Sequence, residues 1–244
     1  MRTTVITGGT GAIGLSIAHR LLSEGFYVAL IGSSIGSAKK AQALIDEYPD
    51  DCSFWVCDLR SLAELDSRIR EIHDARGSID VLVNCAGVLE TEGPEQLTEK
   101  IWDEVIDVNL KSCFFAIQSC LPYLKNGQFP RIVNVSSNAG RMGGYANGSA
   151  YAASKGGIIS LTYNLARKLA KFGITVNCVA PGTIESEMIQ DLPIAVKQNL
   201  IDKFPVGRFG TGSEIASAVH YFVMENSSFT TGAVLDVNGG LFMG

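Results

Sequence analysis

Short runs of apolar, β-branched residues alternate along the chain with longer stretches of helical periodicity. The apolar runs are continuous, which is typical of parallel strands whose two faces are both covered by helices. Strands separated by helical segments indicate βαβ units, and right-handed crossovers then give a doubly wound sheet. The pattern predicts an α/β protein with seven parallel strands, at Thr4–Thr7, Tyr27–Ile31, Phe54–Cys57, Val81–Asn84, Ile132–Ser136, Thr175–Val179 and Val234–Val237.

The composition is that of one folded unit. Hydrophobic residues make up 46% of the 244 positions and charged residues 18%, without blocks of either. No linker or shift in composition divides the chain, so a single domain over residues 1–244 is expected. A net charge of −5 without a basic cluster argues against nucleic-acid binding. No apolar run reaches the roughly 18 residues that cross a bilayer, and no signal peptide precedes the first strand, so we expect a cytoplasmic protein that does not bind a membrane.

The cysteines and histidines lack the spacing of metal ligands. None of the 6 cysteines forms a CxxC pair, and the 3 histidines are far apart in sequence. Cysteines of proteins in reducing compartments are usually free and buried. We therefore expect buried free thiols and no metal site.

A glycine-rich segment, TGGTGAIG at Thr7–Gly14, joins the first strand to an amphipathic helix that ends near Leu22. Glycines allow a tight turn and a close approach of backbone to a phosphate, and the helix N-terminus offers N–H groups. The segment predicts a pyrophosphate site, with a plain strand-to-helix turn as the alternative. Its spacing differs from the GxGxxG of longer dinucleotide-binding enzymes.

The residues after the second strand bear on the choice of cofactor. They read Gly32-Ser33-Ser34, about twenty residues beyond Gly14, where an NAD enzyme carries Asp or Glu. Such a carboxylate would repel the 2′-phosphate of NADP. Its absence, with two hydroxyls and with Lys39 and Lys40 downstream, favours NADP(H). NAD(H) stays open, because no Arg occupies the place and the lysines also fit a solvated helix face.

Polar residues follow the third and fourth strands, at the sheet edge where ligands of such folds bind. Asp58 is interpreted either as an acceptor for an adenine amino group or as the N-cap of a helix beginning near Leu62. Asn84 is expected to tie strand ends together, and Ala86-Gly87 to let a cofactor approach the backbone. Asn109 lies in an otherwise amphipathic helix, roughly residues 102–124, so it marks a break or has a function.

Tyr151 and Lys155 lie four residues apart at the start of a long helical pattern. Residues at i and i+4 share one face of a helix. A phenol titrates near pH ~10, and a neighbouring cation favours the phenolate, so the pair predicts a proton-transfer centre. Ser136 and Ser137, at the end of the fifth strand, offer a hydroxyl that can polarise a substrate carbonyl, although serine pairs there are also ordinary turn residues.

With these motifs in this order, the chain resembles the short-chain dehydrogenase/reductase family over essentially its whole length. The motifs that carry the resemblance are TGGTGAIG, NCAG at 84–87, the Asn109 helix, NVSS at 134–137 followed by YAASK at 151–155, and APGTIESEM at 180–188. Ala12 departs from the family, which commonly has Gly there. The resemblance implies a single-domain Rossmann fold and an NAD(P)-dependent oxidoreductase acting on CH-OH or C=O groups.

The resemblance also implies roles for individual residues. Tyr151 is the general acid/base, and Lys155 both favours its phenolate and binds the nicotinamide ribose. Ser137, in preference to Ser136, orients the substrate carbonyl, and Asn109 holds a water in a proton relay. Together with the motifs above, the expected cofactor contacts are Gly8, Thr10, Gly11, Ile13, Gly14, Ser33, Ser34, Asp58, Leu59, Asn84, Ala86, Gly87, Tyr151, Lys155, Pro181, Gly182, Ile184 and Ser186.

Residues 204–240 are similar to those of 3-oxoacyl-[acyl-carrier-protein] reductases, which are typically homotetramers, and residues 185–204 resemble the mobile substrate lid of the family. These reductases dock an acidic carrier through basic residues. The corresponding places here read Gln128 and Phe172, with Arg131 and Lys171 nearby as candidate substitutes.

The expected function is an NADP(H)-dependent carbonyl reductase acting on a small molecule, with 3-oxoacyl thioesters as one substrate class. A free ketone or a coenzyme A thioester is also open as substrate. The alternatives are an NAD-dependent alcohol, polyol or sugar dehydrogenase, and a regulator that senses NADP without turnover.

Overall fold

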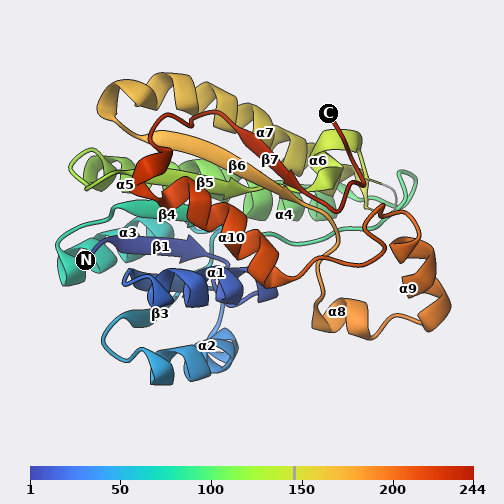
Figure 1. Ribbon diagram of the computed structural model, residues 1–244, viewed down its shortest axis with the longest axis horizontal. Helices are drawn as coiled ribbons and strands as arrows, with labels where there is room; N and C mark the ends of the chain where they lie inside the picture. Colours follow the sequence, from blue (N-terminus) through green and yellow to red (C-terminus); the bar gives the residue numbers. More distant parts are fainter. Residues whose placement is uncertain (145–146) are drawn as a thin grey trace.

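Seven strands form one parallel sheet in the order β3-β2-β1-β4-β5-β6-β7 (Figure 1). The computed structural model describes residues 1–144 and 147–244, and the side chains of these residues except 35, 187 and 188. The predicted α/β class and doubly wound parallel sheet are confirmed. The strands are β1 (Thr3–Thr7), β2 (Tyr27–Gly32), β3 (Cys52–Val56), β4 (Val81–Asn84), β5 (Arg131–Val135), β6 (Thr175–Pro181) and β7 (Val234–Val237).

Helices cover both faces of the sheet. Helices α3, α5 and α7 pack on one face, and α1, α2 and α10 pack on the other (Figure 1). This arrangement explains the continuous apolar runs, because every residue of β1, β2 and β6 is buried. The helices are α1 (Ala12–Ser23), α2 (Ile35–Glu47), α3 (Leu62–Arg76), α4 (Glu99–Ile106), α5 (Ser112–Leu124), α6 (Asn138–Met142), α7 (Ser149–Leu169), α8 (Glu187–Gln190), α9 (Ile194–Ile201) and α10 (Gly212–Val223).

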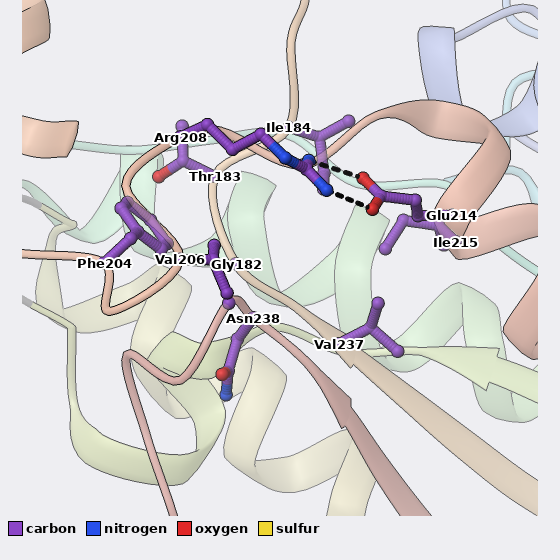
Figure 2. A pocket seen from close by; sticks show the side chains of 12 residues that line it. Gly182, Thr183, Ile184, Phe204, Val206, Arg208, Glu214, Ile215, Val237 and Asn238 are labelled. Atoms are coloured by element: carbon purple, nitrogen blue, oxygen red, sulfur yellow. Dashed lines mark hydrogen bonds and ion pairs between the residues drawn. The ribbon is translucent and has the colours of Figure 1, made fainter.

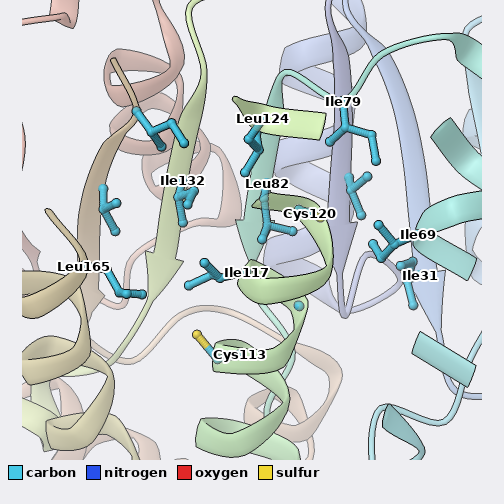
Figure 3. Packing of buried hydrophobic residues seen from close by; sticks show 14 of the residues in the cluster. Ile31, Ile69, Ile79, Leu82, Cys113, Ile117, Cys120, Leu124, Ile132 and Leu165 are labelled. Atoms are coloured by element: carbon cyan, nitrogen blue, oxygen red, sulfur yellow. The ribbon is translucent and has the colours of Figure 1, made fainter. Parts of the chain in front are cut away.

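The core on the α5 side is close-packed between helix and strands. Ile117 of α5 lies between Leu82 of β4 and Ile132 of β5, and all three are at most 1% exposed (Figure 3). Cys113 and Cys120 point from the same helix into this layer (Figure 3). All 6 cysteines are free, and every one except the partly buried Cys85 is buried, which agrees with the sequence prediction.

The sheet reverses its direction of growth between β1 and β4. Strands β1, β2 and β3 extend to one side of this point, and β4, β5, β6 and β7 extend to the other. In doubly wound sheets the ligand crevice forms at such a switch point, outside the carboxyl ends of the strands. The loops after β1 and β4 therefore meet where a cofactor is expected.

The predicted continuous helix over residues 102–124 is interrupted. Helix α4 begins earlier, at Glu99, and a π-helical turn (Asp107–Lys111) separates it from α5. Asn109 lies in this turn. A π turn adds one residue to the helical register, and such turns are frequent at functional sites.

Candidate active site

The loops after β1 and β4 are in direct contact at the switch point. Gly8 has φ +65°, and a Cβ there would lie 2.6 Å from the Cα of Ala86. Only glycine fits this place, because both the backbone conformation and the space exclude a side chain. Asn84 ties β4 to β5 as predicted, since its Nδ2 donates to Asn134 Oδ1 at 3.0 Å. Asn134 in turn donates to Thr162 of α7 at 2.9 Å, so a buried amide relay joins both strands to the helix that carries Tyr151.

Helix α1 begins with its N-terminal amides directed at this crevice. Gly11 is its N-cap, and no side chain among the described residues caps it. A Cβ at Gly14 would lie 2.4 Å from Gly8 O, so the first turn packs directly on the loop. Uncapped N–H groups on a glycine loop fit a pyrophosphate. By contrast, hydroxyls cap five other helices, α2, α3, α4, α6 and α10, from Ser34, Ser61, Thr98, Ser137 and Thr211.

The end of β2 presents hydroxyls and no carboxylate. Ser33 is exposed, and Ser34 accepts a hydrogen bond from Ser37 N at 3.3 Å as the N-cap of α2. Gly32 packs beside Thr10, whose Oγ1 would lie 3.2 Å from a Cβ at residue 32. The two serines therefore adjoin the glycine loop, as an adenosine ribose site requires.

Asp58 does not cap α3, so that interpretation of it was wrong. The N-cap is Ser61, whose side chain accepts from Glu64 N. The Asp58 carboxylate instead accepts from Arg60 Nε at 3.0 Å and Nη2 at 2.8 Å. These hydrogen bonds from Arg60 lower the pKa of Asp58. A contact to adenine would therefore share this carboxylate with Arg60.

Tyr151 and Lys155 lie one turn apart on α7, and Lys155 is fixed at the end of β5. Its Nζ donates to Val135 O at 3.0 Å and lies 5.7 Å from the centre of the Tyr151 ring. Lys155 is 4% exposed, whereas Tyr151 is half-buried. A Cβ at Gly87 would lie 3.2 Å from the same Nζ. The ammonium thus lies between the NCAG loop, the strand end and the phenol.

The two candidate serines have different environments. Ser136 is 3% exposed, and its hydroxyl donates to Lys155 O at 2.7 Å, which fixes the strand to α7. Ser137 is the N-cap of α6, where it accepts from Ala139 N at 3.1 Å and donates to Asn138 Oδ1 at 3.0 Å. The Ser137 proton goes to a neighbouring side chain that is able to rotate, so it is the more available of the two for a substrate carbonyl.

Asn109 is 1% exposed, and both the oxygen and the nitrogen of its side-chain amide make hydrogen bonds. Oδ1 accepts from Val88 N at 2.8 Å, while Nδ2 donates to Val88 O at 3.0 Å and to Ser154 Oγ at 3.1 Å. Oδ1 would also lie 3.4 Å from a Cβ at Gly87, close to Lys155 Nζ. The π turn therefore brings the amide to the site and connects it to α7.

Pro181 is the last residue of β6, which pairs with β5, and Gly182, Ile184 and Ser186 follow it. Gly182 N donates to Val237 O at 3.0 Å, and residues 182–184 line a small pocket of about 90 Å³ (Figure 2). At its rim Arg208 makes two hydrogen bonds to Glu214, at 2.7 and 3.0 Å. These bonds lower the pKa of Glu214 to about 2. Tyr151 and Lys155 are not among the residues that line this pocket.

The sequence analysis did not identify the groups that contact Asn109 and Lys155 and hold them in place. Ser154 bonds Asn109, Val88 bonds the same amide through its backbone, and a Cβ at Gly140 would lie 2.6 Å from the carbonyl carbon of Lys155. Of these groups, only Ser154 could have been expected near the site from the sequence, because residues three apart in a helix lie close to each other and Ser154 follows Tyr151 by three. The other contacts join segments far apart in sequence.

Neither a metal centre nor a membrane segment is found in the described part of the chain. Within residues 1–144 and 147–244, no three His, Cys, Asp or Glu side chains come together as a metal site requires. None of the described helices has the length and apolarity to cross a bilayer.

The fold and the site define an α/β oxidoreductase with a nicotinamide cofactor, acting on carbonyl or hydroxyl groups. Residues 2–196 match the short chain dehydrogenase family, and the chain belongs to that family. The resemblance stated from the motifs is thereby confirmed.

Similar proteins cover nearly the full chain. A 3-oxoacyl-[acyl-carrier-protein] reductase FabG of Staphylococcus aureus strain MW2 is 37% identical over 99% of this chain and 98% of its own. The reductase MabA of Mycobacterium avium, with the same activity in its name, is 33% identical over 100% and 91%. The crystal structure of gox2181 superposes with a TM-score of 0.93 at 29% identity, covering 98% of this chain and 95% of that one.

Proposed function

We propose that this protein is an NADP(H)-dependent carbonyl reductase that converts 3-oxoacyl thioesters to 3-hydroxyacyl thioesters. The observation that carries the proposal is the buried Lys155 ammonium, held by Val135 O beside the Tyr151 ring at the end of β5. The substrate class is supported by the relatives that are named 3-oxoacyl-[acyl-carrier-protein] reductases. The complete set of Asn109, Ser137, Tyr151 and Lys155 argues against a sensor without turnover.

Each of these residues has one part in the proposed reaction. A bound nicotinamide supplies a hydride to the carbonyl carbon. Tyr151 gives its hydroxyl proton to the carbonyl oxygen, and Lys155 stabilises the phenolate that remains. Ser137 turns its hydroxyl from Asn138 to the same carbonyl oxygen and orients the substrate. Asn109 would hold a water on a relay from Lys155, since Asn109 Oδ1 and Lys155 Nζ would lie 3.4 and 3.2 Å from a Cβ at Gly87.

The remaining predicted contacts hold the cofactor. Gly8, Gly11 and Gly14 would shape the pyrophosphate cradle at the N-terminus of α1, with Thr10 and Ile13 beside them. Leu59 would contact the cofactor next to Asp58, after the end of β3. Ala86 and Gly87 would let the cofactor approach the backbone beside Lys155. Pro181, Gly182, Ile184 and Ser186 would flank the nicotinamide, Ile184 through its backbone. Asn84 supports this site through Asn134.

The preference for NADP(H) is proposed from Ser33 and Ser34. Ser34 has a structural bond as the cap of α2, so Ser33 is the better residue to test. Ser33→Asp places a carboxylate beside the ribose, and we expect the ratio of kcat/KM for NADPH to that for NADH to fall at least about tenfold. Ser23→Asp, exposed at the C-terminal end of α1 and away from the glycine loop, is the charge-matched control. A wild-type enzyme that prefers NADH contradicts the proposed cofactor.

Further parts of the proposal concern the lid and the assembly. Residues 185–204, with α8 and α9, are proposed as a lid that closes over substrate. We also propose a cytoplasmic homotetramer by likeness to the carrier-protein reductases. The helical segment that contains Asn109 (α4, the π turn and α5) and α7 would pack between its subunits.

The structure reduces the number of basic residues that could dock an acyl carrier protein. Arg131, a candidate substitute for the missing basic residues, is 2% exposed. Its guanidinium donates to Met224 O, Glu225 O and Ser228 Oγ, so it cannot meet a partner. Gln128 and Phe172 are exposed and uncharged, but Lys171 is exposed and its ammonium lies 5.1 Å from the centre of the Phe172 ring. We therefore propose Lys171 as the one remaining candidate of the two for docking an acidic carrier, and both carrier-protein and coenzyme A thioesters belong to the proposed substrate class.

A substrate panel with both cofactors tests the function. NADPH oxidation is followed with acetoacetyl-coenzyme A, acetoacetyl carrier protein, a simple ketone and an aldose. The proposal predicts the highest kcat/KM for a 3-oxoacyl thioester with NADPH. A ketone or sugar that exceeds every thioester at least tenfold would contradict it.

A further inference from the structure

Glu90, in the loop between β4 and α4, is a buried carboxylate that the proposed reaction does not use. It is 5% exposed. In the described part of the chain, one other carboxylate, Asp80, is also buried (1% exposed), and both its oxygens accept hydrogen bonds at 2.7–2.9 Å. Oε2 of Glu90 accepts from Tyr151 N at 3.4 Å, and Oε1 has no partner among the described residues. Asp80 therefore has the bonds of a structural carboxylate, whereas Glu90 does not.

Glu90 bonds the first turn of α7 at two places. Its carbonyl accepts from Gly148 N at 2.8 Å, and its side chain accepts from Tyr151 N. Gly148 is the N-cap of α7, and no side chain caps it from that position. A carboxylate beside an N-terminal turn is stabilised by the helix dipole. Glu90 thus supplies, from a neighbouring loop, the acceptor that hydroxyls supply at the start of α2, α3, α4, α6 and α10.

Gly148 provides the space for this carboxylate. A Cβ at residue 148 would lie 1.7 Å from Glu90 Oε1 and 2.1 Å from Oε2. The backbone there has φ −76° and ψ 171°, which any residue adopts. The absence of a side chain at 148 is therefore explained by Glu90 and not by the backbone conformation.

The same loop also reaches the Asn109 turn. Val88, two residues before Glu90, bonds the Asn109 amide through both its N–H and its C=O, and that amide bonds Ser154 of α7. Residues 88–90 thereby connect the π turn to α7 at Tyr151 and at Ser154. The backbone position of Tyr151 depends on this loop.

We propose that Glu90 is a positioning residue for the proposed reductase reaction. Its carboxylate accepts the Tyr151 N–H and fixes the first turn of α7, which holds the phenol in place relative to Lys155 and Ser137. The role rests on the proposed function, although the contact itself is testable without catalysis.

Four variants test the role. Glu90→Ala removes the acceptor, and we expect kcat to fall at least tenfold while the Kd for NADPH changes less than threefold. Glu90→Gln keeps an oxygen for Tyr151 N–H and is expected to retain kcat within threefold of wild type. Gly148→Ala expels the carboxylate and should lower kcat as Glu90→Ala does. The double variant Glu90→Ala/Gly148→Ala should be no worse than Gly148→Ala alone, because the clash is gone. Glu95→Ala, exposed in the same loop, is the matched control.

Hydrogen exchange separates this role from the proposed function. Amides of residues 148–152 should exchange at least tenfold faster in Glu90→Ala than in wild type, and at the wild-type rate in Glu90→Gln and Glu95→Ala. An enzyme inactive on the whole substrate panel would sink the proposed function, and the exchange data would still decide the contact. Unchanged exchange in Glu90→Ala, or additive losses of kcat in the double variant, would overturn the role of Glu90.

Discussion

Gly14 is the position where the cofactor cradle is most sensitive to one added methyl group. A Cβ there would lie 2.4 Å from Gly8 O, 2.8 Å from Gly9 Cα and 2.9 Å from Gly9 C. Real Cβ contacts are essentially never under 3.0 Å, and all three atoms are backbone. Gly14→Ala must therefore move α1 away from the glycine loop by more than half an ångström.

Two opposing effects set the size of the loss. Forcing a methyl group into a packed interior costs about 1–3 kcal/mol. Replacing Gly by Ala within a helix returns about 0.5–1 kcal/mol. The net expectation is a destabilisation of roughly 0.5–2 kcal/mol, or a fall in Tm of about 1–8 °C for a domain of this size. The displaced amides should also weaken NADPH binding about tenfold or more.

Another helical glycine supplies the control. Gly36 lies in α2, and its Cβ would meet only Ser34 Oγ at 3.5 Å, so Gly36→Ala should stabilise the protein by about 0.5–1 kcal/mol.

Urea unfolding and fluorescence titration with NADPH measure both effects. We expect Gly36→Ala to be the most stable of the three proteins, wild type to be intermediate and Gly14→Ala to be the least stable. The close packing of Gly14 on Gly8 and Gly9 would be contradicted if Gly14→Ala were more stable than wild type, as Gly36→Ala is expected to be, and bound NADPH with the wild-type Kd.

Two further predictions concern charged side chains. Lys155→Met removes the donor to Val135 O and the cation beside Tyr151, so kcat should fall at least about a hundredfold and the Kd for NADPH should rise. Single-turnover kinetics measure the rate, and fluorescence titration measures the Kd. Unchanged values of both kcat and Kd would refute the role of Lys155. Glu214→Gln removes the charge paired with Arg208, and because this pair is exposed the loss at pH 7 should be only about 0.5–1 kcal/mol. The pKa of Glu214 is lowered from 4.5 to about 2, so its stabilisation is present above pH 4.5 and is lost as the pH falls towards 2. Urea midpoints of wild type and Glu214→Gln should therefore converge at low pH, and a constant difference between pH 7 and pH 2.5 would contradict this origin.

The strands could be predicted because their periodicity is local. Each of the seven predicted strands is present, with ends that differ by at most two residues from those observed. Two strands are extended by two residues: β3, which begins at Cys52, and β6. Strand β6 continues to Pro181 because its end pairs with β7 through residues Ala180 and Pro181. That pairing joins segments more than fifty residues apart, so no local pattern reports it.

The π turn at Asn109 was only partly foreseeable. A polar residue in an apolar helical pattern indicated an irregularity, but not its form. The extra residue is compensated by the bonds from Asn109 to Val88 and Ser154, which depend on the tertiary structure. In the same way, Asp58 has the residue type of a cap, yet Ser61 takes that place and leaves the carboxylate to Arg60.

In the candidate site too, the features set by local spacing could be predicted, and those set by tertiary contacts could not. Spacing alone placed Tyr151 and Lys155 on one helical face, because i and i+4 geometry is fixed by the helix. Which serine points to the crevice was not fixed by spacing, and the structure separates Ser136, bonded to Lys155 O, from Ser137 at the cap of α6. No local pattern could predict the contact of Glu90 with α7, because its partners Gly148 and Tyr151 lie about sixty residues away in sequence.

The most direct test of the central proposal is the single-turnover rate of Tyr151→Phe with saturating NADPH and an acetoacetyl thioester. The variant keeps the ring beside Lys155 and removes only the transferable proton. The rate should fall by a factor of about 10²–10⁴, while the Kd for NADPH stays within about threefold of wild type. A Tyr151→Phe enzyme that turns over at the wild-type rate would contradict proton transfer by Tyr151.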